Sequence, residues 1–490
     1  MDDKKNNPPA GTESGVKRAP AQNPLGTMPV GRLMVKFAVP SITTSLINAV
    51  YNITDQVFIG RSVGYLGNAA TNIAFPVVSL CIAVTIMIGI GSSSNFSLRL
   101  GAGKKDKAAD VALTGMSMLV IFGVLIGLSA FIFTEPLMRA FGATDQIFPY
   151  AVTYTRIIAV GIPFVLFSTG LSNLIRADGS PGYSLFALAS GAVLNIILDA
   201  IFIFVFKMGI AGAARATVIS QTVSFLISAG YLRRFKSVRL KGRFPPIKAE
   251  CLAAIFKLGV PGFINHFMMT VIQITMNNTL RFYGAESIYG SDIPLAVVGV
   301  ISKLSVVIIA FNVGIALACQ PIIGFNYGAG NYARVKETYK RAAVFVVAIS
   351  MVIFACFQLF PRQIVSIFGT GDENYFLFAE RYMRIYMMMV CLFGLQPLTA
   401  NFFTSIGKAY KGLFITVTRQ GLFLFPLLLI LPRFLGFDGI VYAGPISDSA
   451  AIIAAVLFAF FEMKEITRIE KARDAGVTLD PGESREGRRP

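Results

Sequence analysis

The sequence is poor in charge. Only 14% of its 490 residues are Asp, Glu, Lys or Arg, where a soluble globular domain carries about 25%. Hydrophobic residues make up 54% of the chain. A soluble chain of this composition could not cover its surface with polar side chains, whereas a lipid-embedded chain does not need to. The composition therefore excludes an ordinary soluble fold and indicates a membrane protein.

Residues and motifs for metal binding and catalysis are also scarce. His266 is the only histidine, so no histidine cluster can bind a metal. The five cysteines fall in or beside apolar runs without paired spacing, which predicts neither disulfides nor a zinc site. Gly103-Lys104 and Gly407-Lys408 lack the remaining residues of a phosphate-binding loop. We therefore expect no ATP hydrolysis, no enzyme activity and no cofactor beyond a coupling ion.

Long apolar runs are what the sequence has in abundance. A spanning helix needs roughly 20 apolar residues, and about twelve runs reach that length. The predicted fold class is an all-α polytopic membrane protein. The runs lie near residues 33–60, 68–92, 111–133, 150–172, 182–206, 211–232, 251–280, 294–318, 341–360, 379–400, 411–432 and 438–462.

The net charge of +18 is concentrated in alternate loops. Lys and Arg gather in the second, sixth, eighth and tenth loops, and the sixth, within 233–250, is the most basic. Because basic loops stay in the cytoplasm, we expect both termini to be cytoplasmic and the protein to lie in a prokaryotic plasma membrane. This placement explains the positive charge without a nucleic-acid partner.

The two halves of the sequence resemble each other. Lys36 and Pro40 match Lys257 and Pro261, and YTRI in the fourth run matches YMRI in the tenth. FGATD at 141–145 matches FGTGD at 368–372. Such repeats predict two six-helix lobes related by a pseudo-two-fold axis along the membrane normal, with a cleft between them. The predicted parts are a disordered tail (1–29), a first lobe (30–232), a basic linker (233–250), a second lobe (251–465) and a charged tail (466–490).

Two acids occur where lipid should exclude charge, at a cost of about 2.5–3.5 kcal/mol or more each. Asp55 and Asp199 lie in outward-running spans at similar depth. Their repeat mates are Met276 and Leu427, so the fold does not require them. Because burial disfavours the charged form, this pair could exchange a proton, or it could hold a sodium ion. The alternative is a merely structural hydrogen-bonded pair, or an Asp55 wetted at the interface.

Other polar positions are candidates for a substrate-binding cleft. Asn48, Tyr51 and Asn52 share a helical stripe with Asp55. In the second half, Gln273 and Met276 occupy the matching span. Lys303 lies inside the eighth span, where it could line the cleft or pair structurally with an acid or a helix end. Arg419 and Asp448 are predicted to pair between helices.

Five stretches in order resemble the multidrug and toxic compound extrusion (MATE) transporters, particularly the prokaryotic ones. They are AVPSITTSLINAVYNITDQVFIGR, RLGAGKKDKAA, LIRADGSP, SGAVLNIILDAIFIF and GIAGAARATVIS. The resemblance implies export of cationic amphipathic compounds in exchange for protons or sodium ions. It also implies a cation site in the first lobe, whereas Gln273 and Met276 depart from the pattern of second-lobe acids. The residues of that implied site are Asp55, Asn173, Asn195, Asp199 and Thr217.

A flippase for lipid-linked precursors, from the related superfamily, is the alternative function. That class has more spans and a more cationic cleft, and the acids here favour cationic cargo. An ion channel is less consistent with the sequence because no filter-like loop is present. The expected partners are small cationic molecules and membrane lipid, and the expected state is a monomer.

Overall fold

The computed structural model describes residues 23–238, 240, 247–290, 292–366 and 373–475, and every element assigned within them is helical. Eleven of these helices are long and apolar enough to cross a membrane, and a bent pair raises the number to twelve. The predicted fold class, an all-α polytopic membrane protein with about twelve transmembrane helices, is therefore confirmed.

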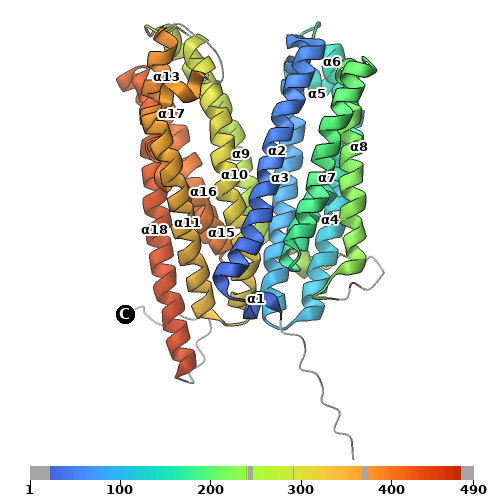
Figure 1. The fold of residues 1–490 in the computed structure, drawn as a ribbon, viewed down its shortest axis with the longest axis vertical. Coiled ribbons are helices and arrows are strands. Elements are labelled where there is room, and N and C mark those ends of the chain that lie inside the picture. Colours follow the sequence, from blue (N-terminus) through green and yellow to red (C-terminus); the bar gives the residue numbers. More distant parts are fainter. Residues whose placement is uncertain (1–22, 239, 241–246, 291, 367–372, 476–490) are drawn as a thin grey trace, which may run out of the picture.

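The helices form two groups that follow each other in the chain (Figure 1). The first comprises α1 (Pro24–Thr27), α2 (Val30–Val63), α3 (Tyr65–Gly101), α4 (Lys105–Ile132), α5 (Thr134–Ala140), α6 (Phe148–Ala177), α7 (Pro181–Ala200), η1 (Ile201–Val205), α8 (Gly209–Gly230) and η2 (Tyr231–Arg234). The second comprises α9 (Ala249–Ala285), α10 (Asp292–Gly328), α11 (Tyr332–Leu359), α12 (Pro361–Ser366), α13 (Glu373–Tyr386), α14 (Val390–Phe393), α15 (Leu395–Ser405), α16 (Ala409–Val417), η3 (Thr418–Leu424), α17 (Phe425–Leu435) and α18 (Asp438–Asp474).

The tenth span is broken. Residues 373–386 and 390–405 form two helical segments inclined to each other by 41°, and the three methionines at 387–389 make the turn between them. Hydropathy gives no sign of this break because the three methionines of the turn and the residues after them are apolar. The sequence predicted one continuous run over 379–400.

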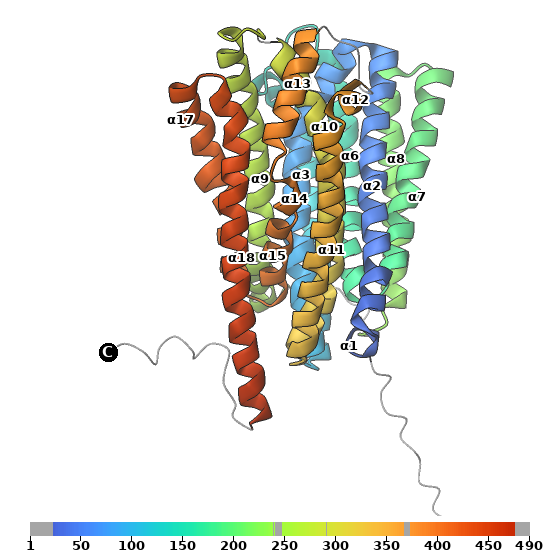
Figure 2. The ribbon, with the colours of Figure 1, turned by 60° about the vertical axis from the view of Figure 1, so that its left-hand side comes forward.

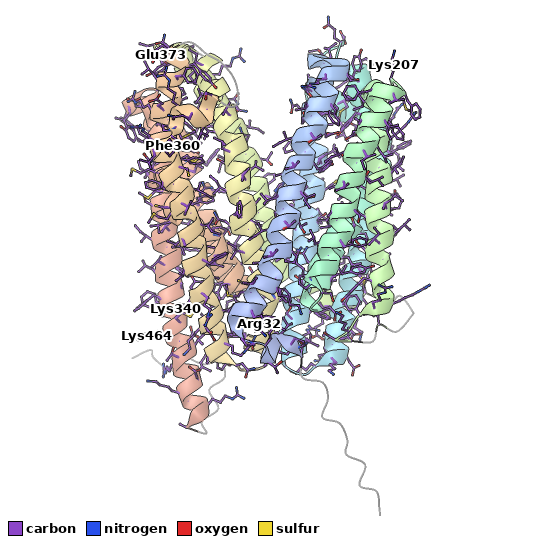
Figure 3. The ribbon with its side chains drawn as sticks, viewed as in Figure 1. Arg32, Lys207, Lys340, Phe360, Glu373 and Lys464 are labelled. Atoms are coloured by element: carbon purple, nitrogen blue, oxygen red, sulfur yellow. The ribbon has the colours of Figure 1, made fainter. Side chains whose placement is uncertain are left out.

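The two groups approach each other at one end of the molecule and diverge at the other (Figure 1). We name the first the closed end, which carries α1 and residues 101–105 and 328–332. The open end carries residues 63–65 and 285–290. Figure 3 shows Arg32, Lys340 and Lys464 toward the closed end, and Lys207 and Glu373 at the open end.

Glycines bring the two groups into backbone contact in the closed half. A Cβ atom added at Gly259 on α9 would lie 2.0 Å from the carbonyl oxygen of Met87 on α3. One at Gly91 on α3 would lie 2.1 Å from the carbonyl oxygen of Ile255. Such approaches are possible only without a side chain. Among described residues, the interlobe hydrogen bonds reach no nearer the open end than Ser79, whose hydroxyl lies 3.0 Å from that of Thr270.

The described part of the predicted N-terminal tail is packed against the second lobe. Leu25, on α1, is 1% exposed, and its carbonyl oxygen accepts hydrogen bonds from Asn326 Nδ2 at 2.9 Å and Arg334 Nη2 at 3.3 Å. The prediction of a disordered tail was therefore wrong for residues 23–29, because one leucine entering a formed core orders a segment that has no apolar run. Residues 1–22 lie outside the described residues.

The C-terminal helix also continues past its predicted limit. α18 extends beyond the other helices at the closed end (Figure 2). Ile466 is fully buried, Glu470 pairs with Lys336 on α11, and Arg473 Nη1 donates to the Gly330 carbonyl at 2.8 Å. The predicted start of a tail at 466 is thus corrected, because these contacts hold the last turns against the second lobe.

Candidate functional site

The two intramembrane acids of the first lobe meet inside it. Asp55 on α2 is 8% exposed and Asp199 on α7 is fully buried. Their carboxyl groups lie close enough for a hydrogen bond between them. One oxygen of each, Oδ1, has no hydrogen-bond partner among the described residues. The structure thus brings together the pair that the sequence predicted.

Asn195 and Thr217 complete this cluster. Asn195 precedes Asp199 by four residues, so both side chains point from the same face of α7. In the amide orientation that gives both of its atoms a partner, Asn195 Nδ2 donates to Asp199 Oδ2 at 2.9 Å, and Oδ1 accepts from the Thr217 N–H at 3.2 Å. The amide therefore connects the acid to α8.

A π-helical turn, η1, begins two residues after Asp199. Turns of this kind are rare and often lie at functional sites. η3 is a similar turn in the second lobe, between α16 and α17. The wide turn changes the helical register beyond Asp199. Spacing along the sequence therefore does not tell which face of the helix the residues after Asp199 occupy.

Two tyrosines face the acids. Tyr51, from α2, lies close enough to interact with both carboxyl groups and with the Thr217 side chain. Tyr154, from α6, is also close enough to interact with both. The sequence predicted Tyr51 and missed Tyr154, although the repeated YTRI segment that contains it was a signal.

The chemistry of this cluster suits a proton or a small cation. Two carboxylates sharing a buried site cannot both stay ionised without a positive charge nearby. No ion pair joins Asp55 or Asp199 to a basic side chain in the part of the chain described. The two unpartnered Oδ1 atoms are therefore free to bind a shared proton or a sodium ion.

A cavity of about 80 Å³ lies beside this cluster. Asn48 and Tyr51 line it together with Asn195 and Thr217. This volume holds a few water molecules, so an ion could reach the acids through it. The cavity is much smaller than a site for a drug-sized molecule.

Two predicted residues lie elsewhere in the first lobe. Asn173 lies four residues before the end of α6, at the closed end, and its Oδ1 accepts from Arg176 Nη2 at 2.6 Å. α7 runs in the opposite direction, so Asp199 lies near the open end, and the structure does not bring Asn173 to the acids. Asn52 is exposed, and its Nδ2 donates to the Asn48 carbonyl of its own helix at 2.6 Å.

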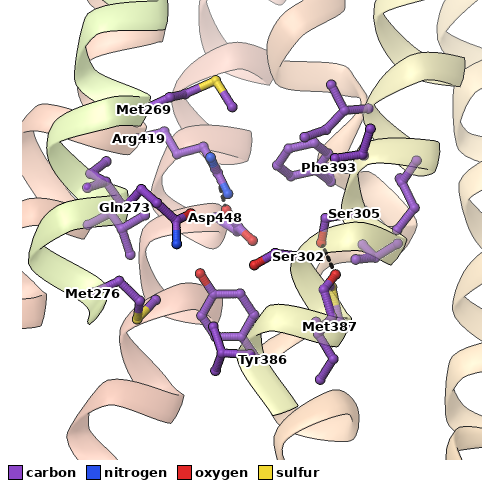
Figure 4. A pocket seen from close by; sticks show the side chains of 18 of the residues that line it. Met269, Gln273, Met276, Ser302, Ser305, Tyr386, Met387, Phe393, Arg419 and Asp448 are labelled. Atoms are coloured by element: carbon purple, nitrogen blue, oxygen red, sulfur yellow. Dashed lines mark hydrogen bonds and ion pairs between the residues drawn. The ribbon is translucent and has the colours of Figure 1, made fainter. Parts of the chain in front are cut away.

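The second lobe contains a larger cavity of about 270 Å³ (Figure 4). Gln273 and Met276 line it. Tyr382 also lines it and is the repeat mate of Tyr154, so the cavity is the second-lobe counterpart of the acid cluster. Lys303 lies on α10, but its side chain is outside the described residues.

A buried ion pair lies at the wall of this second-lobe cavity. Arg419 Nε is 2.6 Å from Asp448 Oδ1, which confirms the predicted pairing between helices. Figure 4 shows the Tyr386 hydroxyl and the Gln273 side chain pointing toward the same space. Because the carboxylate is neutralised by its arginine, this cavity lacks the uncompensated acids of the first lobe.

Comparison with known proteins identifies the family to which this chain belongs. The MatE family model matches residues 40–201 and 265–430, one segment in each lobe and more than half of the chain. The multidrug export protein MepA of Staphylococcus saprophyticus subsp. saprophyticus is 27% identical over 444 residues, covering 90% of this chain and 95% of that protein. MepA of Staphylococcus aureus strain MSSA476 is 26% identical over 442 residues, with the same two coverages.

Solved structures share the fold. A MOP superfamily transporter from Pyrococcus furiosus Vc1 superposes with a TM-score of 0.83 at 24% identity, covering 91% of this chain and 98% of that chain. A multidrug resistance MATE family transporter in an outward-facing conformation gives a TM-score of 0.83 at 24% identity, covering 90% and 97%. With the family model matched in both lobes, this chain belongs to the multidrug and toxic compound extrusion (MATE) family of membrane transporters.

Proposed function

We propose that this protein exports cationic amphipathic compounds by antiport, driven by an inward gradient of protons or sodium ions. The observation that carries the proposal is the buried pair of Asp55 and Asp199, each with an unpartnered carboxyl oxygen. The MepA relatives are multidrug export proteins by name, which supports the same class of cargo. The acids give the first lobe an affinity for positive charge.

In this proposal Asp55 and Asp199 bind the coupling ion. Asn195 orients the Asp199 carboxyl group by donating a hydrogen bond to it, and Thr217 holds the Asn195 amide in place. Tyr51 and Tyr154 cover the pair. Asn48 and Tyr51 line the adjoining space, while Gln273 and Met276 offer a second contact surface across the molecule. Asn173 has no part in ion binding here.

Alternating access requires the two lobes to exchange which end is closed. The contacts between lobes that involve glycine lie in the closed half, so the state described is closed at one end only. We place the closed end in the cytoplasm, because the basic loops gather there and basic loops favour that side. Export then ends with release at the open end, outside a prokaryotic plasma membrane.

The test is transport of a fluorescent cationic dye such as ethidium in proteoliposomes, with a pH gradient and a sodium gradient imposed separately. We expect one of the two gradients to drive wild-type transport, and Asp55→Asn and Asp199→Asn each to abolish it. The matched control is Asp145→Asn, the same chemical change at an exposed position of the same lobe, which should transport normally.

Two outcomes would contradict this proposal. If either acid variant were still driven by the gradient, the first-lobe pair would not couple transport. If neither gradient moved the dye through the wild-type protein, the cargo would be wrong. Movement of a lipid-linked anionic precursor would then be the next assay.

A further inference from the structure

A third cavity, remote from the acid cluster, lies at the closed end of the first lobe. It has a volume of about 520 Å³ and is formed by the first turns of α2, the turn between α6 and α7, and the segment that follows α8. Its charged lining residues are Lys36, Arg234 and Lys236. Three cations from separate parts of the chain therefore face one space.

None of these three charges forms an ion pair with a carboxylate of the described residues. Asp178, a buried acid beside the pocket, is 3% exposed and is held by hydrogen bonds instead. Its Oδ2 accepts from the Tyr231 hydroxyl at 2.7 Å and from the Lys236 N–H at 2.8 Å, and its Oδ1 accepts from the Ser237 N–H at 2.9 Å. Asp178 thus fixes the backbone that carries Lys236.

The pocket also holds an uncharged donor. Ser180 lines the pocket and is 8% exposed, and its hydroxyl lies near that of Tyr231. Ser180 is the N-cap residue of the 20-residue helix α7, and its side chain makes no capping bond. The positive end of that helix dipole therefore points toward the same space as the Ser180 hydroxyl.

The turn leaves room for a ligand to approach the helix end. A Cβ atom added at Gly182 or at Gly179 would meet no atom within 4 Å. Gly179 has a φ of 88°, a conformation that favours glycine. A tetrahedral anion could thus contact the helix N-terminus, the hydroxyl and the cations together, which is the combination that binds phosphate in proteins.

We propose that this pocket binds a phosphate group, either as the headgroup of an anionic phospholipid or as a free phosphate. An exposed apolar side chain beside the pocket favours the lipid as the source. Phe186 on α7 is 59% exposed, and its ring lies 6.5 Å from that of Tyr183, which lines the pocket. Acyl chains would lie along this surface toward the membrane core, below a headgroup held at the closed end.

The test is native mass spectrometry of the full-length protein in a neutral detergent. Phosphatidylglycerol is titrated against phosphatidylcholine as the zwitterionic reference, and inorganic phosphate is titrated in a separate arm. The test variant combines Lys36→Gln, Arg234→Gln and Lys236→Gln. The control removes three exposed charges from the same end without touching the pocket: Arg32→Gln, Lys104→Gln and Lys105→Gln.

We expect one phosphatidylglycerol to bind the wild-type protein in preference to phosphatidylcholine. The test variant should lose this affinity by about tenfold or more, since charge-assisted hydrogen bonds dominate such sites, and the control should keep it. Ser180→Ala, which removes no charge, should weaken binding severalfold. If inorganic phosphate displaced phosphatidylglycerol, the site would be assigned to a free anion. If inorganic phosphate did not displace it, the site would be assigned to the lipid.

Equal losses in the test and control variants would overturn the proposal, because general surface charge would then explain the binding. Unchanged binding in the test variant would overturn it too. A circular dichroism melt of each variant shows whether it is folded. Ser180→Ala changes only a hydroxyl group and should therefore fold normally. If the triple variant is unstable, unchanged phosphatidylglycerol binding by Ser180→Ala would still overturn the proposal. None of these outcomes depends on the coupling ion or the cargo.

Discussion

Gly259→Ala should weaken closure of the closed end. Its Cβ atom would lie 2.0 Å from the Met87 carbonyl oxygen, whereas carbon and oxygen in contact rest about 3.3 Å apart. The helices α3 and α9 must therefore separate by about 1.3 Å, the difference between these distances. No side-chain rotation can relieve the contact because the obstructing atom belongs to the backbone. Overpacking of this kind costs about 1–3 kcal/mol.

This penalty applies only to the state in which the closed end is shut. A cost of about 1–3 kcal/mol corresponds to a shift of roughly 5- to 150-fold in the equilibrium between conformations. Electron–electron distance measurement on spin labels should detect a shift of this size. One label pair replaces Lys104 and Asn331, which are exposed on the two lobes at the closed end. The exposed Cys356 is first changed to serine.

We expect Gly259→Ala to add a longer closed-end distance to the distribution, and Gly91→Ala to do the same by the reciprocal contact with Ile255. Gly299→Ala is the matched control, because a Cβ atom there meets nothing within 4 Å. If the Gly259→Ala distribution coincided with those of the wild type and of Gly299→Ala, the closed end would not be limited by this backbone contact, and the reasoning would fail.

Three further predictions concern buried polar groups. Arg419→Met should lower stability by about 3–5 kcal/mol, because it leaves Asp448 as an unpaired buried carboxylate. Thermal unfolding followed by fluorescence-detected size exclusion should show this loss. Adding Asp448→Leu should restore much of the lost stability. Lys411→Met should lower thermal stability less than Glu462→Gln, since Glu462 is fully buried and accepts from two lysines. A larger loss of stability in Lys411→Met than in Glu462→Gln, measured by the same melts, would contradict this. Asn195→Ala should slow gradient-driven dye transport while keeping the fold, because the Asp199 carboxyl group loses a hydrogen bond worth about 1.5–3 kcal/mol, and an unchanged rate would remove Asn195 from the site.

The sequence was sufficient for the features that depend on local patterns. Hydropathy located the spans, and helical spacing placed Asn195 and Asp199 on one face of α7. The costly burial of two acids was enough to identify Asp55 and Asp199 as partners. These predictions rest on the helical spacing of residues and on their position along a span, and a single helix determines both.

The features missed depend on contacts between distant segments. Asn173 was assigned to the ion site from the family resemblance, yet α6 runs opposite to α7, so a residue late in α6 lies at the other end from Asp199. The same argument places Tyr154, early in α6, beside the acids. Docking of Leu25 on the second lobe depends on a core formed some 300 residues later in the chain, with Asn326 as a partner, and no local pattern encodes that contact.

The chain passes from the first lobe to the second only once, between Arg234 and Ala249. Covalent linkage raises the effective concentration of one lobe near the other and adds no contact of its own. The glycine-mediated surfaces around Gly91 and Gly259 would be the same if the two lobes were made as separate polypeptides. Confinement to a shared membrane would supply much of the missing concentration. Two half-length chains, produced together, are therefore expected to reassemble into a working transporter, so that each lobe can be labelled or mutated independently of the other.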